Sequence, residues 1–172
     1  MIDLRQNVVS QAVALATPVC KVFEGFSFKP YVCPAGYWTI GWGHRCSKDQ
    51  PEISRATGEA LLRKDLEIAA TAAVRLCPIL LDQPPHRLAA IISWVFNLGA
   101  GRLQGSTMRR RINSKEWEQA ARELRKWNLS AGKRLRGLMK RRAAEVALFM
   151  ADNPRLAANL GSFDSDLQWV YR

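Results

Sequence analysis

The sequence lacks several features that would assign it quickly to a class of proteins. None of its apolar stretches approaches the length of a membrane span, and the most apolar one, residues 8–23, contains Gln11 and Pro18. That stretch looks like an amphipathic helix and carries no cleavage signal of a secretory peptide. Only two histidines are present, and none of the four cysteines belongs to a Cys-x-x-Cys pair, so no metal-binding spacing exists. We therefore expect a soluble protein that is made in the cytoplasm, keeps its thiols free and uses no metal or organic cofactor.

The composition is that of one folded domain with a strongly basic region. The chain has 172 residues, 48% of them hydrophobic, which suffices for a single core and argues against disorder. The formal net charge is +11, and residues 102–142 alone carry fourteen Lys or Arg against three Glu. The rest of the chain is balanced. A basic region of this kind favours a polyanion, which could be a nucleic acid, an anionic lipid or a bacterial envelope polymer.

The hydrophobic pattern predicts a mainly helical chain with one β-hairpin. Thr17 and Pro18 are typical of a helix start, and Gly25 of a helix end, so a short helix is expected over 18–24. Residues 31–33 and 37–40 read as two strands joined by a turn at 34–36. Further helices are expected at 57–77, from the Pro84-Pro85 pair to about residue 97, and at 106–112, 115–127 and 134–150.

One acidic residue, Glu24, stands apart from all other carboxylates of its region. It falls in the last turn of the predicted helix among Phe23, Phe26 and Phe28, and no further carboxylate follows until Asp49. The negative end of a helix and an aromatic environment both disfavour an anion, as an acid that must donate a proton requires. Thr39 and Cys33 lie on the two predicted strands and could converge with Glu24 on one cleft.

At these residues the chain resembles the phage-type lysozymes, or endolysins, of glycoside hydrolase family 24. The family pattern is Glu, eight residues, Asp or Cys, five residues and Thr, and Glu24, Cys33 and Thr39 match it. The surrounding motif continues through Trp38-Thr39-Ile40-Gly41-Trp42-Gly43-His44. Three further stretches resemble family motifs, at residues 96–101 (FNLGAG), 106–109 (STMR) and 137–145 (GLMKRRAAE), so the likeness covers about 8–150.

The resemblance implies an α+β, lysozyme-like fold formed by a single domain over 1–172. A small lobe with the catalytic hairpin would span 1–56, and a connecting helix would span 57–77. A larger helical lobe would span 78–151, with the cleft between the two lobes, and a C-terminal tail would span 152–172.

The resemblance also implies an activity, which is hydrolysis of the β-1,4 bond between N-acetylmuramic acid and N-acetylglucosamine in peptidoglycan during host-cell lysis. Glu24 would be the general acid, and Thr39 would orient the attacking water. Cys33 takes the place that Asp holds in the best-known members; as a thiolate it could stabilise positive charge at the anomeric carbon or position water. Without a second carboxylate, direct attack by water with inversion is favoured over a covalent intermediate.

Other site residues follow from the same likeness. The residues expected to border the sugar subsites are Gly43 and Arg45 on the hairpin side and Phe96 and Ser106 on the opposite side. His44 is expected to be structural and paired with a carboxylate. Arg134 or Arg142 could pair with Glu24 and orient it, and the spacing does not choose between them. Arg142 falls within the apolar stripe of its helix, where a cation needs a counter-charge or several acceptors.

We expect a monomer whose partners are peptidoglycan and, through the basic region, anionic polymers of the cell envelope; no nucleic acid is expected. The protein would be made in the host cytoplasm and act on the cell wall, in the periplasm, at lysis. Two alternatives remain open. One is a lytic transglycosylase, which also uses a single Glu; the other is a basic membrane-binding or nucleic-acid-binding protein without catalysis.

Overall fold

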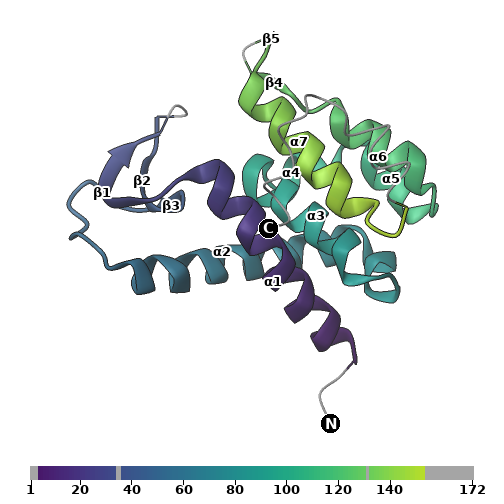
Figure 1. Cartoon of the computed structure of the whole chain (residues 1–172), viewed down its shortest axis with the longest axis horizontal. Helices are drawn as coiled ribbons and strands as arrows, with labels where there is room; N and C mark the ends of the chain where they lie inside the picture. Colours follow the sequence, from purple (N-terminus) through teal and green to yellow (C-terminus); the bar gives the residue numbers. More distant parts are fainter. Residues whose placement is uncertain (1–3, 34–35, 131, 154–172) are drawn as a thin grey trace.

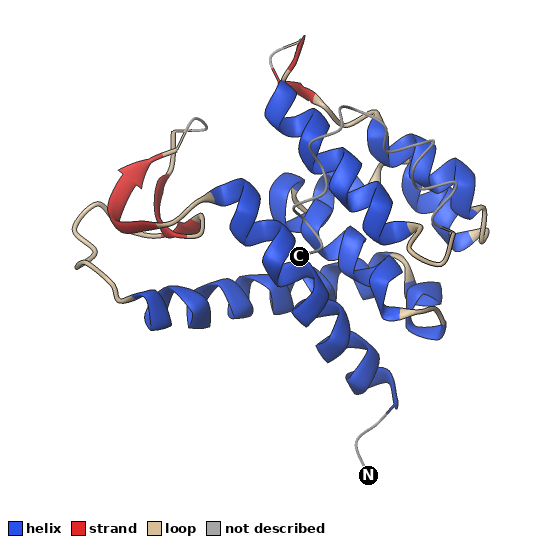
Figure 2. Ribbon diagram, in the orientation of Figure 1, coloured by secondary structure: helices blue, strands red, loops and turns tan. Residues whose placement is uncertain are grey.

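The computed structural model describes residues 4–33, 36–130 and 132–153, and these form a helical body with a small antiparallel sheet (Figures 1 and 2). The elements are α1 (Leu4–Glu24), β1 (Ser27–Val32), β2 (Trp38–Gly41), β3 (His44–Arg45), α2 (Arg55–Leu76), the 3-10 turn η1 (Pro78–Asp82), α3 (Pro85–Leu98), α4 (Ala100–Gln104), α5 (Thr107–Asn113), α6 (Trp117–Arg125), β4 (Leu129–Ser130), β5 (Lys133–Arg134) and α7 (Arg136–Phe149). The predicted α+β class is confirmed.

The first helix is one element that contains the amphipathic stretch 8–23 and is much longer than the short helix predicted over 18–24. It begins at Leu4 rather than at Pro18, which lies inside it. An internal proline costs a helix one backbone hydrogen bond, but burial of one face of α1 against the other helices stabilises it. Thr17 does not cap a helix; its hydroxyl donates to the carbonyl of Val13 at 2.8 Å. The end is as predicted, because Gly25 takes a φ of +67° and leaves Glu24 as the last helical residue.

The sheet has the strand order β1-β2-β3, with antiparallel neighbours. Thr39 in the central strand lies opposite Tyr31 of β1 and Arg45 of β3. Strand β3 has only two residues, too few for a periodic signal, and was not predicted. The predicted turn residues 34–35 lie outside the described part of the chain.

Helix α3 forms the centre of the core. Every residue from Arg87 to Val95 is buried on it, and α1, α2 and α7 pack around it. Trp94 meets Trp127 edge-to-face, with ring centroids 5.1 Å apart. Figure 1 shows the sheet at one end, the helices from α3 onward at the other, and α2 running between them. Helix α1 packs on α3, and its C-terminal end leads into the sheet at β1.

The remaining helical predictions are confirmed in type, with shifted ends. Helix α2 is capped by Ser54, whose hydroxyl accepts from the Thr57 amide at 3.0 Å. The short elements η1 and α4 and the ribbon of β4 and β5 were not predicted, and the ribbon places Arg134 outside the last helix. The lobe limits at residues 56 and 77 stay a prediction, and most of the expected tail lies outside the described residues. Among the described helices, none is both long and apolar enough to cross a membrane.

Candidate active site

Glu24 lies where α1, the sheet and α7 meet. Its side chain is 23% exposed and forms an ion pair with Arg141 of α7, a residue 117 positions away in the sequence. On its other side lies Gly43, in the turn between β2 and β3. A Cβ atom added to Gly43 would lie 3.3 Å from Glu24 Oε2. The carboxyl group is thus partly open to solvent, held by one cation and approached closely by backbone.

The partner of Glu24 is Arg141, and the prediction of Arg134 or Arg142 was wrong. Arg134 is exposed on β5. Arg142 is buried but turns away toward Asn97 Oδ1, at 3.0 Å, and toward Glu145. Successive residues on a helix point about 100° apart, so Arg141 reaches Glu24 while Arg142 points toward Asn97.

Arg141 also changes the electrostatic picture. The sequence indicated an environment that disfavours a charged Glu24, through the helix end and the nearby phenylalanines. The structure adds a guanidinium in direct contact with this carboxyl group. Burial by itself lowers the pKa of Arg141, but the neighbouring carboxylates of Glu145 and Glu24, with Cys20, outweigh it, so the pKa lies above its ordinary value. Arg141 is therefore a permanent cation beside Glu24.

Thr39 and Cys33 belong to the same face of the hairpin. Thr39 lies opposite Tyr31 in the register, and the Cys33 amide donates to the Tyr37 carbonyl at 2.9 Å. Residues opposite each other in an antiparallel pair share a face, as do residues two apart in one strand. The Thr39 hydroxyl is buried and donates to the Tyr31 carbonyl at 3.3 Å, so its oxygen can still accept a hydrogen bond.

Two further hairpin residues have defined neighbours. The Arg45 guanidinium lies 3.9 Å from the centroid of the Tyr37 ring, a cation–π stack on the face that also carries Thr39, since Arg45 lies opposite Thr39. His44 has the expected carboxylate partner: its Nδ1 lies 2.8 Å from Asp65 Oδ2, which ties β3 to α2.

The two residues expected on the helical side are less available. Phe96 is half-buried at the end of α3 and packs against the core. Ser106 is buried as the N-cap of α5, where its hydroxyl donates to the Leu103 carbonyl at 2.8 Å and accepts from the Arg109 amide at 3.0 Å. The Ser106 hydroxyl is thus used, as donor and as acceptor, by hydrogen bonds within the protein. Contact between Ser106 and a substrate stays a prediction.

All four cysteines, which lie in the described residues, are free thiols. Burial raises the pKa of Cys20 to about 11 and that of Cys77 to about 12, so both are neutral at physiological pH. Burial also raises the pKa of Cys46. Cys33 is the partly exposed thiol that shares a face with Thr39.

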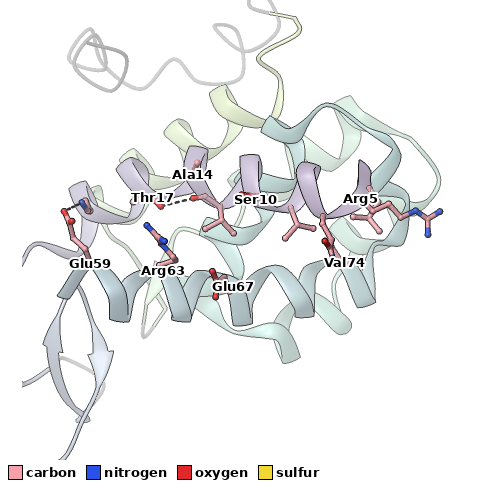
Figure 3. Close-up of a pocket in the computed structure, with 13 residues that line it drawn as sticks. Arg5, Ser10, Ala14, Thr17, Glu59, Arg63, Glu67 and Val74 are labelled. Carbon is pink, nitrogen blue, oxygen red and sulfur yellow. Dashed lines mark hydrogen bonds and ion pairs between the residues drawn. The ribbon is translucent and has the colours of Figure 1, made fainter. Parts of the chain in front are cut away.

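A separate groove of about 950 Å³ runs between α1 and α2 (Figure 3). Ser10, Ala14 and Thr17 line it from α1, and Arg63 and Glu67 from α2. Glu24 and the hairpin residues are not part of its lining, so the groove is distinct from the candidate site.

Comparison with known proteins agrees with this arrangement. The family model for phage lysozyme matches residues 21–145. The endolysin of Bacillus phage B103 is 37% identical over 134 residues, which are 76% of this chain and 50% of that protein. The endolysin of Acyrthosiphon pisum secondary endosymbiont phage 1 is 38% identical over 75% of this chain and 90% of its own length.

A solved structure agrees as well. The muramidase domain of SpmX from Asticaccaulis excentricus matches with a TM-score of 0.68 and 29% identity, over 81% of this chain and 95% of that one. This chain spans half the length of the Bacillus phage protein and nearly all of the other two. With the family model matching well over half of its residues, the chain belongs to the phage lysozyme family.

Proposed function

We propose that the protein is an endolysin, a lysozyme-type glycoside hydrolase that cleaves the β-1,4 bond between N-acetylmuramic acid and N-acetylglucosamine in peptidoglycan. The observation that carries the proposal is the position of Glu24, a partly exposed carboxyl group at the junction of helices and sheet, oriented by Arg141. The relatives named endolysin and muramidase support the same activity. In this chemistry Glu24 protonates the leaving glycosidic oxygen.

The hairpin supplies the second half of the reaction. Thr39 orients the attacking water through its hydroxyl oxygen, whose proton is donated to the Tyr31 carbonyl. Cys33, on the same face, lies next to that water or next to the positive charge that develops at the anomeric carbon. With no second carboxylate on this face, water attacks directly and the anomeric configuration inverts.

The proposed sugar-binding residues surround this centre. Gly43 leaves room beside the carboxyl group, because any side chain there would meet Glu24. Arg45, stacked on Tyr37, presents guanidinium N–H groups that can donate to sugar oxygens or to peptide-stem carboxylates. Phe96 offers an apolar surface opposite, and Ser106 fixes the start of α5.

The basic region binds anionic polymers of the cell envelope when the protein, made in the host cytoplasm as a monomer, reaches the cell wall at lysis. Arg141 and Arg142 belong to this region by sequence but are buried and neutralised by carboxylates, so they add nothing to the surface charge. The exposed arginines of α5 and α6 carry this contact, and it weakens with salt because exposed charges are screened within about 10 Å at 0.1 M.

Mass spectrometry of the fragments released from purified peptidoglycan tests the function. Hydrolysis leaves a reducing end, whereas a lytic transglycosylase leaves an anhydro sugar that is lighter by one water. Glu24→Gln should lower the rate by about 10²–10⁴-fold. The matched control is Glu52→Gln, which removes an exposed carboxylate paired with Lys29 and should act like the wild type. If Glu24→Gln lyses cells stripped of their outer membrane as fast as the wild type, a non-catalytic membrane-binding protein replaces the enzyme.

A further inference from the structure

A fully buried carboxyl group lies one helical turn beyond Arg141. Glu145 has 0% of its side chain exposed. A carboxylate in such a place is costly unless cations and hydrogen-bond donors compensate it. Here Arg141 and Arg142 both approach it, and the hydroxyl of Ser93 on α3 donates to its Oε1 at 2.8 Å. The Oε1 atom accepts hydrogen bonds from Ser93 and both arginines, and Oε2 lies 2.9 Å from Arg142 Nε as an ion pair, so its neighbours connect the group to the candidate site.

The donors of Arg141 are divided among partners on three helices. Nη1 donates to Glu24 on α1, and Nε donates to Glu145 Oε1 at 3.2 Å. Nη2 donates to the Ser93 carbonyl at 3.2 Å and lies 3.8 Å from Cys20 Sγ. A guanidinium is planar, so holding Nε and Nη2 also determines the direction of Nη1. The bonds to Glu145 and Ser93 therefore direct the Nη1–H group of Arg141 toward the carboxylate of Glu24.

The charges of this cluster balance only when Glu145 is included. Arg141 and Arg142 are adjacent buried cations, and Glu24 and Glu145 are the two carboxylates beside them. Burial lowers the pKa of Arg142, and the carboxylate of Glu145 offsets part of that effect. Without the charge of Glu145, Glu24 would be the remaining carboxylate of a cluster that holds two buried guanidinium groups, and among the described residues Arg141 would have Glu24 as its one carboxylate partner. Glu24 would then be held in its ionised form, which cannot donate a proton.

No other charged group faces Glu24 among its described contacts. The Cys20 thiol on its own helix is neutral, since burial raises its pKa to about 11. Ser93 of α3 is uncharged, and Gly43 of the β2–β3 turn brings only backbone. The balance between the arginines and Glu145 therefore determines the local field.

We propose that Glu145 is a positioning residue for the reaction: it aims Arg141 at Glu24 and neutralises the second buried cation. Its effect on turnover rests on the proposed function, whereas its effect on Glu24 rests on the contacts among α1, α3 and α7 alone. Glu145 acts through Arg141 and does not touch the substrate.

Glu145→Gln tests this, because it keeps the shape of the side chain and removes the charge. On soluble peptidoglycan fragments we expect kcat to fall at least about tenfold, with KM within about twofold of the wild type. The high-pH limb of the rate profile should move to lower pH. The matched control is Glu118→Gln, which removes an exposed carboxylate paired with Arg122 at i,i+4 on α6 and should change neither quantity.

A double variant separates positioning from simple structural support. Glu145→Gln with Arg142→Gln removes one charge of each sign, so the high-pH limb should return toward its wild-type position while kcat stays low. If Glu145 only supported the structure, the high-pH limb of the double variant would not return toward its wild-type position. An unmoved limb in the single variant, or a kcat within about twofold of the wild type, overturns the proposal.

If Glu145→Gln does not fold, as judged by its thermal transition, the same measurements are made on Glu145→Asp instead. It keeps the charge but shortens the reach, so kcat should fall while the high-pH limb stays in place. An unchanged kcat in this variant overturns the proposal.

An NMR measurement distinguishes failure of this proposal from failure of the proposed function. If the wild type does not cleave peptidoglycan, the carboxyl carbon of Glu24 can still be titrated in the wild type and in Glu145→Gln without any turnover. A midpoint that moves to lower pH in the variant supports the proposal, and an unmoved midpoint overturns it.

Discussion

The close approach of Gly43 to Glu24 gives a test of the site that needs one added methyl group. Gly43 has a φ of +83°, and a Cβ there would lie 3.3 Å from Glu24 Oε2. Gly43→Ala therefore has two costs. An L-residue in the left-handed region costs roughly 1–2 kcal/mol of folding free energy. The methyl group also displaces a carboxyl group by a few tenths of an ångström, against the hold of Arg141.

Gly36→Ala separates these two costs. Gly36 lies in the same hairpin with a φ of +82°, but its added Cβ would meet no atom of the described residues within 4 Å. Both variants should lose about 1–2 kcal/mol of stability, measured by urea denaturation. Only Gly43→Ala should also lose activity, by about tenfold in kcat, because a misplaced catalytic group loses alignment with the scissile bond. Equal activities in the two variants would refute the placement of Glu24 at the reacting centre.

Three further predictions follow from groups that are wholly or partly buried. Arg141→Gln leaves Glu24 without its cation and Glu145 with Arg142 alone, so the free energy of unfolding, measured in urea, should fall by about 3–5 kcal/mol. Burial lowers the pKa of His86. The unfolded chain therefore binds a proton more readily than the folded one, so stability should fall as pH drops below about 6.5, and His86→Gln should flatten that slope in urea titrations at several pH values. Cys20 and Cys77 are fully buried, so native protein purified without reductant should react with a thiol reagent at two sites quickly and at four sites only after unfolding; fewer than four would reveal a disulfide.

Periodic and motif-bearing segments were predictable because their signals are local. Helix α2 shows apolar spacing over many turns, and Ser54 caps it as sequence rules expect. The end of α1 was found from Gly25, and with it the place of Glu24. The amphipathic stretch 8–23 indicated the earlier turns of α1, but Pro18 also predicted a separate helix start, because it is a strong local signal for one. The burial that overrides this signal comes from α3, far along the chain.

The partner of Glu24 was not predictable from a single position. Arg142 drew attention because it falls in an apolar stripe, yet both arginines of the pair are buried. A better signal was Glu145, which lies four residues after Arg141 and three after Arg142 and can therefore reach both on one helix. An acid placed to neutralise two arginines indicates that they are buried together. It does not indicate which arginine faces α1, because that depends on how α7 packs on α3.

This dependence on packing has a consequence for when the site exists. Glu24 comes from the first helix and Arg141 from the last described one, and α3 packs against both helices in the folded chain. Before α7 docks, the carboxyl group has no cation to orient it, and Arg141 and Glu145 have no buried site. Burying one charge of this cluster without its partners is costly, whereas the complete set of ion pairs compensates that desolvation cost. We therefore expect the ion pairs of α7 to form together with the docking of that helix, so that a chain without a docked α7 holds its hairpin motif but not an oriented acid.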